Sequence, residues 1–379
     1  MNTHNLLLAI SLLSAALVAP PALGQLPSDN PMQTTIDKTI DKAVGEFFAT
    51  NQHVGLSIGI YDHGKVAFYN YGTINKSDPG LPSQTSIYEI ASITKTFTGA
   101  LASKALLDGK MSLDGDFRAY LPEPYPNLEK NGKPITLRLL AAHKAGLPKN
   151  VPDTDALFKN PNFDTLPYQL IELEKSYDDA AYLRALHHLE LRSEPGTDFV
   201  YSNFGIKLIG FGLQHVYHQS LEELLKAKIL DPLGMKRTGL AVQPQDQPFL
   251  VHGYSPSGKP MPYHLFNAGA AGGLYSNSED MVRYIAWQLD ENDPVINRSH
   301  SAIFGSGEPV QLGIVWYITR EAGERKIWES GGAFGMASEL VLYPESKFGI
   351  ILLANDGGFS TQDELGALAK KVRAAYVPK

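Results

Sequence analysis

The chain has 379 residues, of which 43% are hydrophobic and 19% charged, a composition typical of ordinary globular enzymes. It contains no Cys, which excludes disulfides, a thiolate zinc site and a Cys nucleophile. The 33 Lys and Arg residues against 40 Asp and Glu residues give a formal net charge of -7, which argues against a nucleic-acid partner because such a partner requires a basic surface.

Residues 1–24 have the pattern of a secretory signal peptide. The apolar run over residues 6–18 is shorter than the roughly 20 residues of a membrane span. The small residues Ala22 and Gly24 follow it at positions that a signal peptidase accepts. We therefore expect cleavage after Gly24 and a periplasmic or secreted protein without a transmembrane anchor. The alternative is an apolar helix that is kept in the mature protein, and the absence of Lys and Arg before residue 6 favours it.

The next part of the chain carries first a helical and then a strand pattern. Apolar residues at helical spacing predict an amphipathic helix over residues 36–50. The β-rich runs 55–61 and 65–71 flank a turn and predict an antiparallel hairpin. A mostly apolar pattern over residues 88–107, closed by Gly109, predicts a buried helix.

The middle of the chain is helical and its end is rich in strands. Prolines punctuate residues 111–201, where no sustained strand pattern appears, and an apolar helix is predicted at residues 204–216. The C-terminal part predicts a closing helix and three strands, at residues 362–376 and at 312–318, 338–343 and 348–354.

Strands from both ends of the chain, with helices between them, predict an α+β fold with an antiparallel sheet flanked by helices. We expect residues 25–110 and 300–379 to form the sheet domain. We expect residues 111–299 to form a mainly helical region inserted into it.

Ser92 and Lys95 form the first candidate site. Residues at i and i+3 of a helix share one face, with Cβ atoms about 5–6 Å apart. The apolar residues around Lys95 would lower the pKa of its amine by desolvation, so that the amine can accept the Ser92 proton. Ser92 is then a candidate nucleophile and Lys95 its base. Because the pattern is common, a helix start with a solvated Lys is the alternative.

The second candidate segment is Tyr201-Ser202-Asn203, directly before the helix at residues 204–216. A Tyr hydroxyl beside a Lys can relay protons, and an Asn amide can orient a substrate. The alternative is a loop Tyr that only packs against its neighbours.

The third candidate segment is rich in Gly and precedes the strand at residues 338–343. Paired glycines beside a strand let a ligand approach the backbone, and an N–H there could complete an oxyanion hole with the N–H of Ser92. A Gly-rich turn or bulge is the alternative. The segment contains Glu329, Ser330, Gly331 and Gly332.

In order and spacing, the three segments resemble the serine β-lactamase and penicillin-binding protein superfamily. The resemblance is to the branch that holds class C β-lactamases, D-Ala-D-Ala carboxypeptidases and related esterases. It covers about residues 36–355 and includes stretches typical of that branch, at residues 134–148, 231–235 and 271–276. It implies a β-lactamase/transpeptidase-like fold.

The resemblance implies an acyl-enzyme on Ser92, with Lys95 and Tyr201 sharing the proton transfers and Asn203 contacting the substrate amide. The backbone N–H groups of Ser92 and Gly332 would form the oxyanion hole. Three neighbours would bind the substrate: Glu329, Ser330 and Gly331. As in class C relatives, deacylation would use a water activated near Tyr201, or the acyl group's own environment, rather than a dedicated Glu on a separate loop.

No metal and no organic cofactor is expected from this resemblance. The partner is a small-molecule or peptide substrate, most simply a β-lactam or a D-Ala-type peptide, with peptidoglycan as one candidate source. A carboxylesterase and a D-aminopeptidase of the same superfamily are the alternatives.

Glu329 departs from the superfamily pattern, because Lys or His usually begins the third motif and helps to hold a substrate carboxylate. An ionised Glu would repel that carboxylate. Three interpretations follow: the substrate lacks a carboxylate, the substrate carries an ammonium group, or another cation nearby restores carboxylate binding. A Glu329 side chain that points away from the cleft is the alternative to all three.

Two other classes of protein compete with the hydrolase. A non-catalytic binding homologue has no chemical need to keep Ser92, Lys95, Tyr201 and Asn203 together. A metalloenzyme lacks an H-E-x-x-H pair here, and neighbouring histidines such as 187 and 188 point in different directions.

Overall fold

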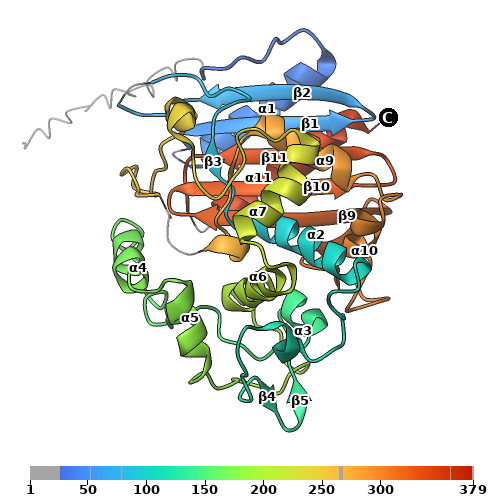
Figure 1. Cartoon of the computed structure of the whole chain (residues 1–379). Helices are drawn as coiled ribbons and strands as arrows, with labels where there is room; N and C mark the ends of the chain where they lie inside the picture. Colours follow the sequence, from blue (N-terminus) through green and yellow to red (C-terminus); the bar gives the residue numbers. More distant parts are fainter. Residues whose placement is uncertain (1–25, 52, 78, 264–267, 359, 378–379) are drawn as a thin grey trace, which may run out of the picture.

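A hairpin from each end of the chain meets in the central sheet. The computed structural model describes residues 26–377 except 52, 78, 264–267 and 359, so the predicted signal peptide lies outside the described residues. The sheet is antiparallel throughout, with the strand order β2-β1-β11-β10-β9-β8-β7 (Figure 1). Its strands are β1 (Gly55–Asp62), β2 (Lys65–Gly72), β7 (Gln311–Leu312), β8 (Tyr317–Glu321), β9 (Glu324–Ala333), β10 (Met336–Tyr343) and β11 (Phe348–Ala354).

Strands β1 and β11 join the two ends of the chain. Ile58 of β1 pairs with Leu352 of β11, and both side chains are fully buried in one apolar layer with helices α1 (Thr35–Thr50) and α11 (Thr361–Tyr376). Burial of one such side chain contributes about 1.5–3 kcal/mol. The N-terminal hairpin and both amphipathic helices are confirmed close to their predicted bounds.

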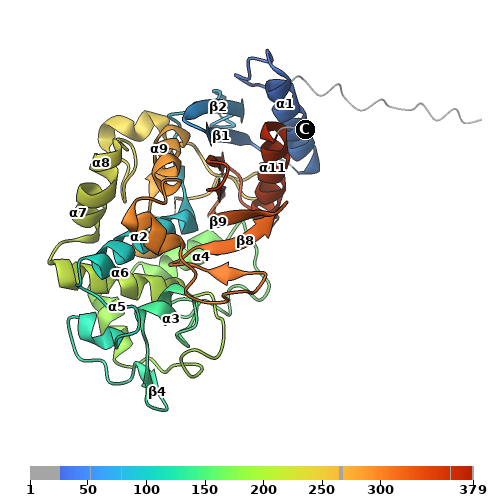
Figure 2. The same ribbon diagram turned by 90° about the vertical axis from the view of Figure 1, so that its right-hand side faces the viewer.

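Helices cover both faces of the sheet. Helices α1 and α11 pack against each other on one face, and α9 (Ser278–Gln288) packs against β1 and β11 on the other (Figure 2). Helix α2 (Thr94–Leu107) leads away from the sheet toward α6 (Asn203–Tyr217), against which it packs. This arrangement confirms the predicted α+β fold class.

The part of the chain between the two sheet segments is mainly helical. Its shorter elements are α3 (Leu137–Ala141), α4 (Leu166–Glu174), α5 (Asp179–Leu186), α7 (Leu221–Leu225), α8 (Asp231–Leu233), α10 (Pro294–His300) and the strand pair β4 (Glu129–Lys130) and β5 (Lys133–Pro134). In Figure 1 the elements from α3 to α6 lie below the sheet, whereas α7 and α9 lie in front of it. One apolar cluster runs from this region to the sheet, and α9 belongs to the sheet layer, so the division at residues 110 and 299 stays a prediction. Among the described residues, no helix combines the length and the apolar character needed to cross a membrane.

Three local predictions differ from the structure. The predicted helix at residues 88–107 begins only at Thr94, because Tyr88–Glu89 pairs as β3 with β6 (Tyr275–Ser276) and Ala91 has a left-handed φ of +46°. The predicted strand at 312–318 is split between β7 and β8, with Val315 at φ +66° between them. The Gly-rich segment before β10 was not predicted as a strand, with a turn or bulge as its alternative, and it forms the end of strand β9.

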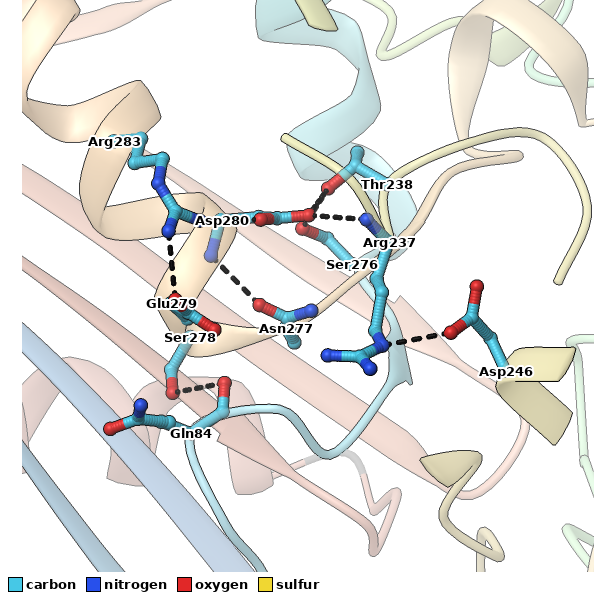
Figure 3. A network of polar contacts seen from close by, with 10 residues as sticks. All are labelled: Gln84, Arg237, Thr238, Asp246, Ser276, Asn277, Ser278, Glu279, Asp280 and Arg283. Carbon is cyan, nitrogen blue, oxygen red and sulfur yellow. Dashed lines mark hydrogen bonds and ion pairs between the residues drawn. The ribbon is translucent and has the colours of Figure 1, made fainter. Parts of the chain in front are cut away.

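A polar network fixes the start of α9 (Figure 3). Asn277 caps the helix by accepting the N–H of Asp280 at 2.8 Å. The buried Asp280 carboxylate accepts the N–H of Arg237 at 2.8 Å and the hydroxyl of Thr238 at 3.0 Å, and it pairs with Arg283 at 2.8 Å. Burial raises the pKa of Asp280, and these donors oppose that rise. The network ties the segment after α8 to the sheet layer.

Candidate active site

Ser92 lies in a tight turn directly before α2. The turn is a 3₁₀ helix, and the left-handed φ of Ala91 is one that residues other than Gly rarely adopt. The preceding residue, Ile90, accepts a hydrogen bond from Ser338 Oγ of β10 at 2.9 Å and donates its N–H to Leu274 O at 3.0 Å. The surrounding structure therefore holds the turn from two sides and fixes the direction of the Ser92 side chain.

Two side chains converge on the Ser92 hydroxyl. Lys95 Nζ and the Tyr201 hydroxyl each lie 2.8 Å from Ser92 Oγ. Lys95 follows at i+3, and its Nζ also donates to Ala271 O at 2.5 Å. Tyr201 lies 109 residues further along the chain, in the loop before α6. The structure brings together the three residues that the sequence analysis assigned to acyl transfer.

Burial changes the proton affinities of both partners of Ser92. Desolvation lowers the pKa of the fully buried Lys95 to about 7, and the charge of Glu329 opposes this fall. Desolvation raises the pKa of Tyr201 well above its usual value, and the charge of Glu329 adds to the rise. At neutral pH, Lys95 is the partner that can accept a proton, whereas Tyr201 keeps its own.

Asn203 is the first residue of α6 and lines the same cleft as Ser92. Its Nδ2 donates to Asn150 Oδ1 at 2.9 Å. The helix start is fixed by Ser202, whose hydroxyl donates to Pro148 O at 2.6 Å and accepts the N–H of Gly205 at 2.9 Å. The amide of Asn203 is therefore held at the wall of the cleft that faces β9.

Strand β9 forms the opposite wall and approaches the Ser92 turn closely. A Cβ atom on Gly331 would lie 2.4 Å from Ile90 O and 2.3 Å from Ser338 Oγ, so only Gly fits here. Ser330 also lines the cleft, and its Oγ accepts a hydrogen bond from Gln362 Nε2 of α11 at 3.3 Å. Gly332 is exposed and lines the cleft beside Ser92.

Glu329 is buried at the base of the cleft, with only 3% of the residue exposed. Desolvation raises the pKa of its carboxyl to about 8, and the charge of Lys95 opposes the rise. The charge of Glu329 also raises the pKa values of Tyr201 and Tyr317. Glu329 therefore lines the cleft, as the three interpretations of its charge require. Its charge acts on Lys95, Tyr201 and Tyr317.

The cleft has a volume of about 460 Å³ and carries few charges. Its helical wall is apolar around α4, where Phe158 and Leu170 line it, and Trp328 of β9 lines the other side. Lys149 lines the cleft beside Asn150, with its Nζ 5.0 Å from the centre of the Phe158 ring. Lys149 is thus a second cation in the site, and its charge contributes to the lowered pKa of Lys95.

Sequence reasoning missed several residues of the site, and three of them lie close together in the chain. Lys149 and Asn150 line the cleft, and His143 supports the loop that carries Tyr201. All three lie in or directly after the stretch 134–148, whose resemblance to the superfamily was the available signal.

The chain resembles known proteins over most of its own length. The chain is 28% identical over 331 residues to "Protein flp" of Staphylococcus aureus (strain N315), an alignment that covers 83% of this chain and 62% of that protein. It is 25% identical over 386 residues to a "Beta-lactamase" of Lysobacter lactamgenus, covering 91% of this chain and 93% of that protein. The chain thus spans less than two thirds of the staphylococcal relative.

Solved structures share the fold at lower sequence identity. A β-lactamase/D-alanine carboxypeptidase from Pseudomonas syringae superposes with a TM-score of 0.76 at 22% identity, covering 91% of this chain and all of that one. A class C β-lactamase superposes with a TM-score of 0.74 at 22% identity, covering 91% and 97% of the two chains. The family model described as Beta-lactamase matches residues 40–374. The chain therefore belongs to the Beta-lactamase family of serine hydrolases.

Proposed function

We propose that the protein is an exported serine hydrolase that forms an acyl-enzyme on Ser92 and releases the acyl group to water. One observation carries this proposal: Lys95 Nζ and the Tyr201 hydroxyl both lie 2.8 Å from Ser92 Oγ. A serine hydroxyl is a weak nucleophile, and it needs a base within hydrogen-bond reach. The lowered pKa of Lys95 supplies such a base near neutral pH.

In the acylation step, the neutral amine of Lys95 takes the proton from Ser92 Oγ as that oxygen bonds to the substrate carbonyl carbon. The carbonyl oxygen gains the negative charge, which the N–H groups of Ser92 and Gly332 would stabilise. The bond to the leaving nitrogen or oxygen then breaks. The leaving group receives a proton from the Tyr201 hydroxyl, which regains one from the Lys95 ammonium.

In the deacylation step, a water near Tyr201 attacks the ester carbon while its proton passes to the Lys95 amine. The bond from that carbon to Ser92 Oγ breaks, Oγ takes a proton from the Tyr201 hydroxyl, and Tyr201 regains one from the Lys95 ammonium. Tyr201 lies within reach of Oγ for this return. No metal or organic cofactor enters either step.

The substrate that family relatives favour is a β-lactam or a D-Ala-type peptide. The names of the Lysobacter and Pseudomonas relatives support it. Lys149 in the cleft also supports it, because it is a cation that could hold a substrate carboxylate in place of the usual Lys or His of the third motif. Export through the signal peptide at residues 1–24 would bring the enzyme to peptidoglycan or to incoming antibiotics.

A neutral ester is the second candidate substrate, and Glu329 favours it. Glu329 cannot attract a substrate carboxylate as the usual Lys or His would. The cleft wall that contains Phe158, Leu170 and Trp328 is apolar, which suits an uncharged acyl group.

Steady-state hydrolysis by the mature protein separates these proposals. Benzylpenicillin, a D-Ala-D-Ala peptide and 4-nitrophenyl butyrate are compared, with Ser92→Ala as the control. We expect Ser92-dependent turnover of at least one of the three. If every substrate that the wild type hydrolyses is hydrolysed equally fast by Ser92→Ala, the assignment of Ser92 as the nucleophile is overturned.

A further inference from the structure

We propose that His143 is a positioning residue for Tyr201, holding the peptide groups on both sides of Tyr201 and packing against its ring. The proposal rests on the acyl-enzyme function proposed above, because it concerns the residue that returns protons to Ser92. His143 is not among the described residues that line the cleft, so it acts through Tyr201.

His143 accepts two hydrogen bonds from the residues that flank Tyr201. The N–H of Val200 donates to the backbone carbonyl of His143 at 2.9 Å. The N–H of Ser202 donates to His143 Nδ1 at 3.1 Å. Tyr201 lies between these two anchors, and its hydroxyl reaches Ser92 Oγ. One residue thus fixes the direction of the backbone on either side of the tyrosine.

The imidazole also supports the phenol ring directly. The ring centres of His143 and Tyr201 lie 4.5 Å apart, with an angle of 37° between the planes. Phe199 contacts the same imidazole edge-on at 5.9 Å. His143 is only 6% exposed, so solvent does not compete for its Nδ1. The phenol is therefore held by its neighbours as well as by its backbone.

The hydrogen bonds determine the protonation state that this role requires. Because Nδ1 accepts the Ser202 N–H, the ring proton lies on Nε2 and the imidazole is neutral. The groups that face it are the Lys95 amine, the Tyr201 phenol and the Ser202 amide. Burial and the charge of Lys95 lower the pKa of His143 to about 3, so Nδ1 stays available as an acceptor over the working range of the enzyme.

The backbone of the segment after α3 is shaped for this contact. His143 has a left-handed φ of +56°, which turns the chain back along residues 192–202. Two further hydrogen bonds continue the pairing, from Gly196 N–H to Lys144 O and from Arg192 N–H to Gly146 O, both at 2.8 Å. The position of His143 opposite Tyr201 is therefore fixed by the register of these two segments.

Two variants separate the acceptor from the ring. His143→Asn keeps an acceptor at the δ position and tolerates the left-handed backbone, but it lacks the ring. His143→Phe keeps a ring but has no acceptor. Each variant is made alone and in combination with Tyr201→Phe. The acylation rate is measured from the burst of nitrophenolate that 4-nitrophenyl butyrate releases.

A misplacement of about 1 Å can lower a rate by about 100-fold. We expect His143→Phe to lower the acylation rate by about 10- to 100-fold with KM little changed, and His143→Asn to lower it less.

The double variant is the decisive arm of the cycle. If His143 acts through the Tyr201 hydroxyl, His143→Phe costs little further rate once Tyr201→Phe is present. A His143→Phe loss of the same size in both backgrounds would overturn the proposal. If His143→Phe does not fold, the same cycle is read with His143→Asn.

Amide hydrogen exchange supplies a readout that needs no turnover. We expect the Ser202 amide to be protected in the wild type and in His143→Asn and to exchange faster in His143→Phe. Unchanged protection of Ser202 in His143→Phe would overturn the proposal even if no acyl donor reacts. A wild type that gives no burst with any acyl donor contradicts the proposed function instead, so the two failures are distinguishable.

Discussion

Lys95 on α2 and Glu329 on β9 are both buried, and the charge of each opposes the effect of burial on the pKa of the other. The superfamily pattern has Lys or His at the position of Glu329, so the usual arrangement places two basic groups near the nucleophile. In this protein the second group is an acid, Glu329, whose charge acts on the Lys95 amine. Burial is the largest influence on the proton affinity of Lys95, and the charge of Glu329 acts against it.

Glu329→Gln removes that charge with little change of shape. Because the Glu329 carboxylate raises the pKa of Lys95, its loss lowers this pKa further. Acylation needs the neutral amine, so the acidic limb of the kcat/KM profile should move to lower pH. The profile is measured with a neutral nitrophenyl ester.

Glu339→Gln is the matched control for this variant. Glu339 is an equally buried acid on β10, but it faces α11, where its Oε1 would lie 3.6 Å from a Cβ on Gly366. We expect the acidic limb to move less than in Glu329→Gln. A Glu329→Gln profile identical to that of the wild type would show that Glu329 does not act on Lys95.

Glu329→Lys tests the charge preference of the cleft. A cation at the third motif should raise kcat/KM for benzylpenicillin relative to an uncharged ester, because it attracts the penicillin carboxylate. The two substrates are compared on one enzyme preparation, which cancels differences in active fraction. An unchanged ratio would mean that position 329 does not set charge specificity.

Tyr201→Phe removes only the hydroxyl that lies 2.8 Å from Ser92 Oγ. Loss of a positioned acid or base lowers a rate by about 100- to 10,000-fold. We expect a loss in this range for acylation or deacylation, measured by stopped-flow kinetics of burst and steady state. Tyr317→Phe is the control, since it removes a hydroxyl from the same cleft, and it should leave both rates nearly unchanged. Wild-type rates in Tyr201→Phe would remove Tyr201 from the proton path.

Gly331→Ala tests the close approach of β9 to the Ser92 turn. The new Cβ would lie 2.4 Å from Ile90 O, which cannot move without displacing that turn. Overpacking of this kind costs about 1–3 kcal/mol of unfolding free energy. We expect lower thermal stability and slower acylation.

Gly332→Ala is the neighbouring comparison for Gly331→Ala. Its Cβ would meet the end of the flexible Gln362 side chain, at 3.0 Å from Oε1, and the backbone N–H is kept. This variant should be more stable than Gly331→Ala in thermal unfolding. Equal stability of the two would contradict the close approach.

The elements that sequence reasoning could predict are those whose burial pattern is local. Helices α1 and α11 each bury one side, and the first hairpin has its turn residues in place, so spacing alone defined them. The start of α2 was predicted six residues too early because the apolar pattern runs on through Tyr88. What ends the helix there is pairing with Ser276, which lies far away in the sequence.

In the candidate site, too, local contacts could be predicted from the sequence and contacts between distant segments could not. The i, i+3 spacing predicted that Lys95 reaches Ser92, since one helical turn brings them together. Nothing local links Tyr201 to Ser92, and only the resemblance placed it there. Gly331 and Gly332 are unfavourable in strands, so strand β9 could not be recognised from propensity. The burial of Glu329, which decides its role, depends on the packing of β9 against the Ser92 turn.

The central claim is that Ser92 carries the acyl group, and mass spectrometry of the intact protein tests it most directly. The enzyme is quenched at short times after mixing with benzylpenicillin or with 4-nitrophenyl butyrate, and the modified peptide is then located. The account predicts a mass increase equal to the acyl group on the peptide that contains Ser92, and no increase in Ser92→Ala. An adduct on another residue, or an equal adduct in Ser92→Ala, would contradict it.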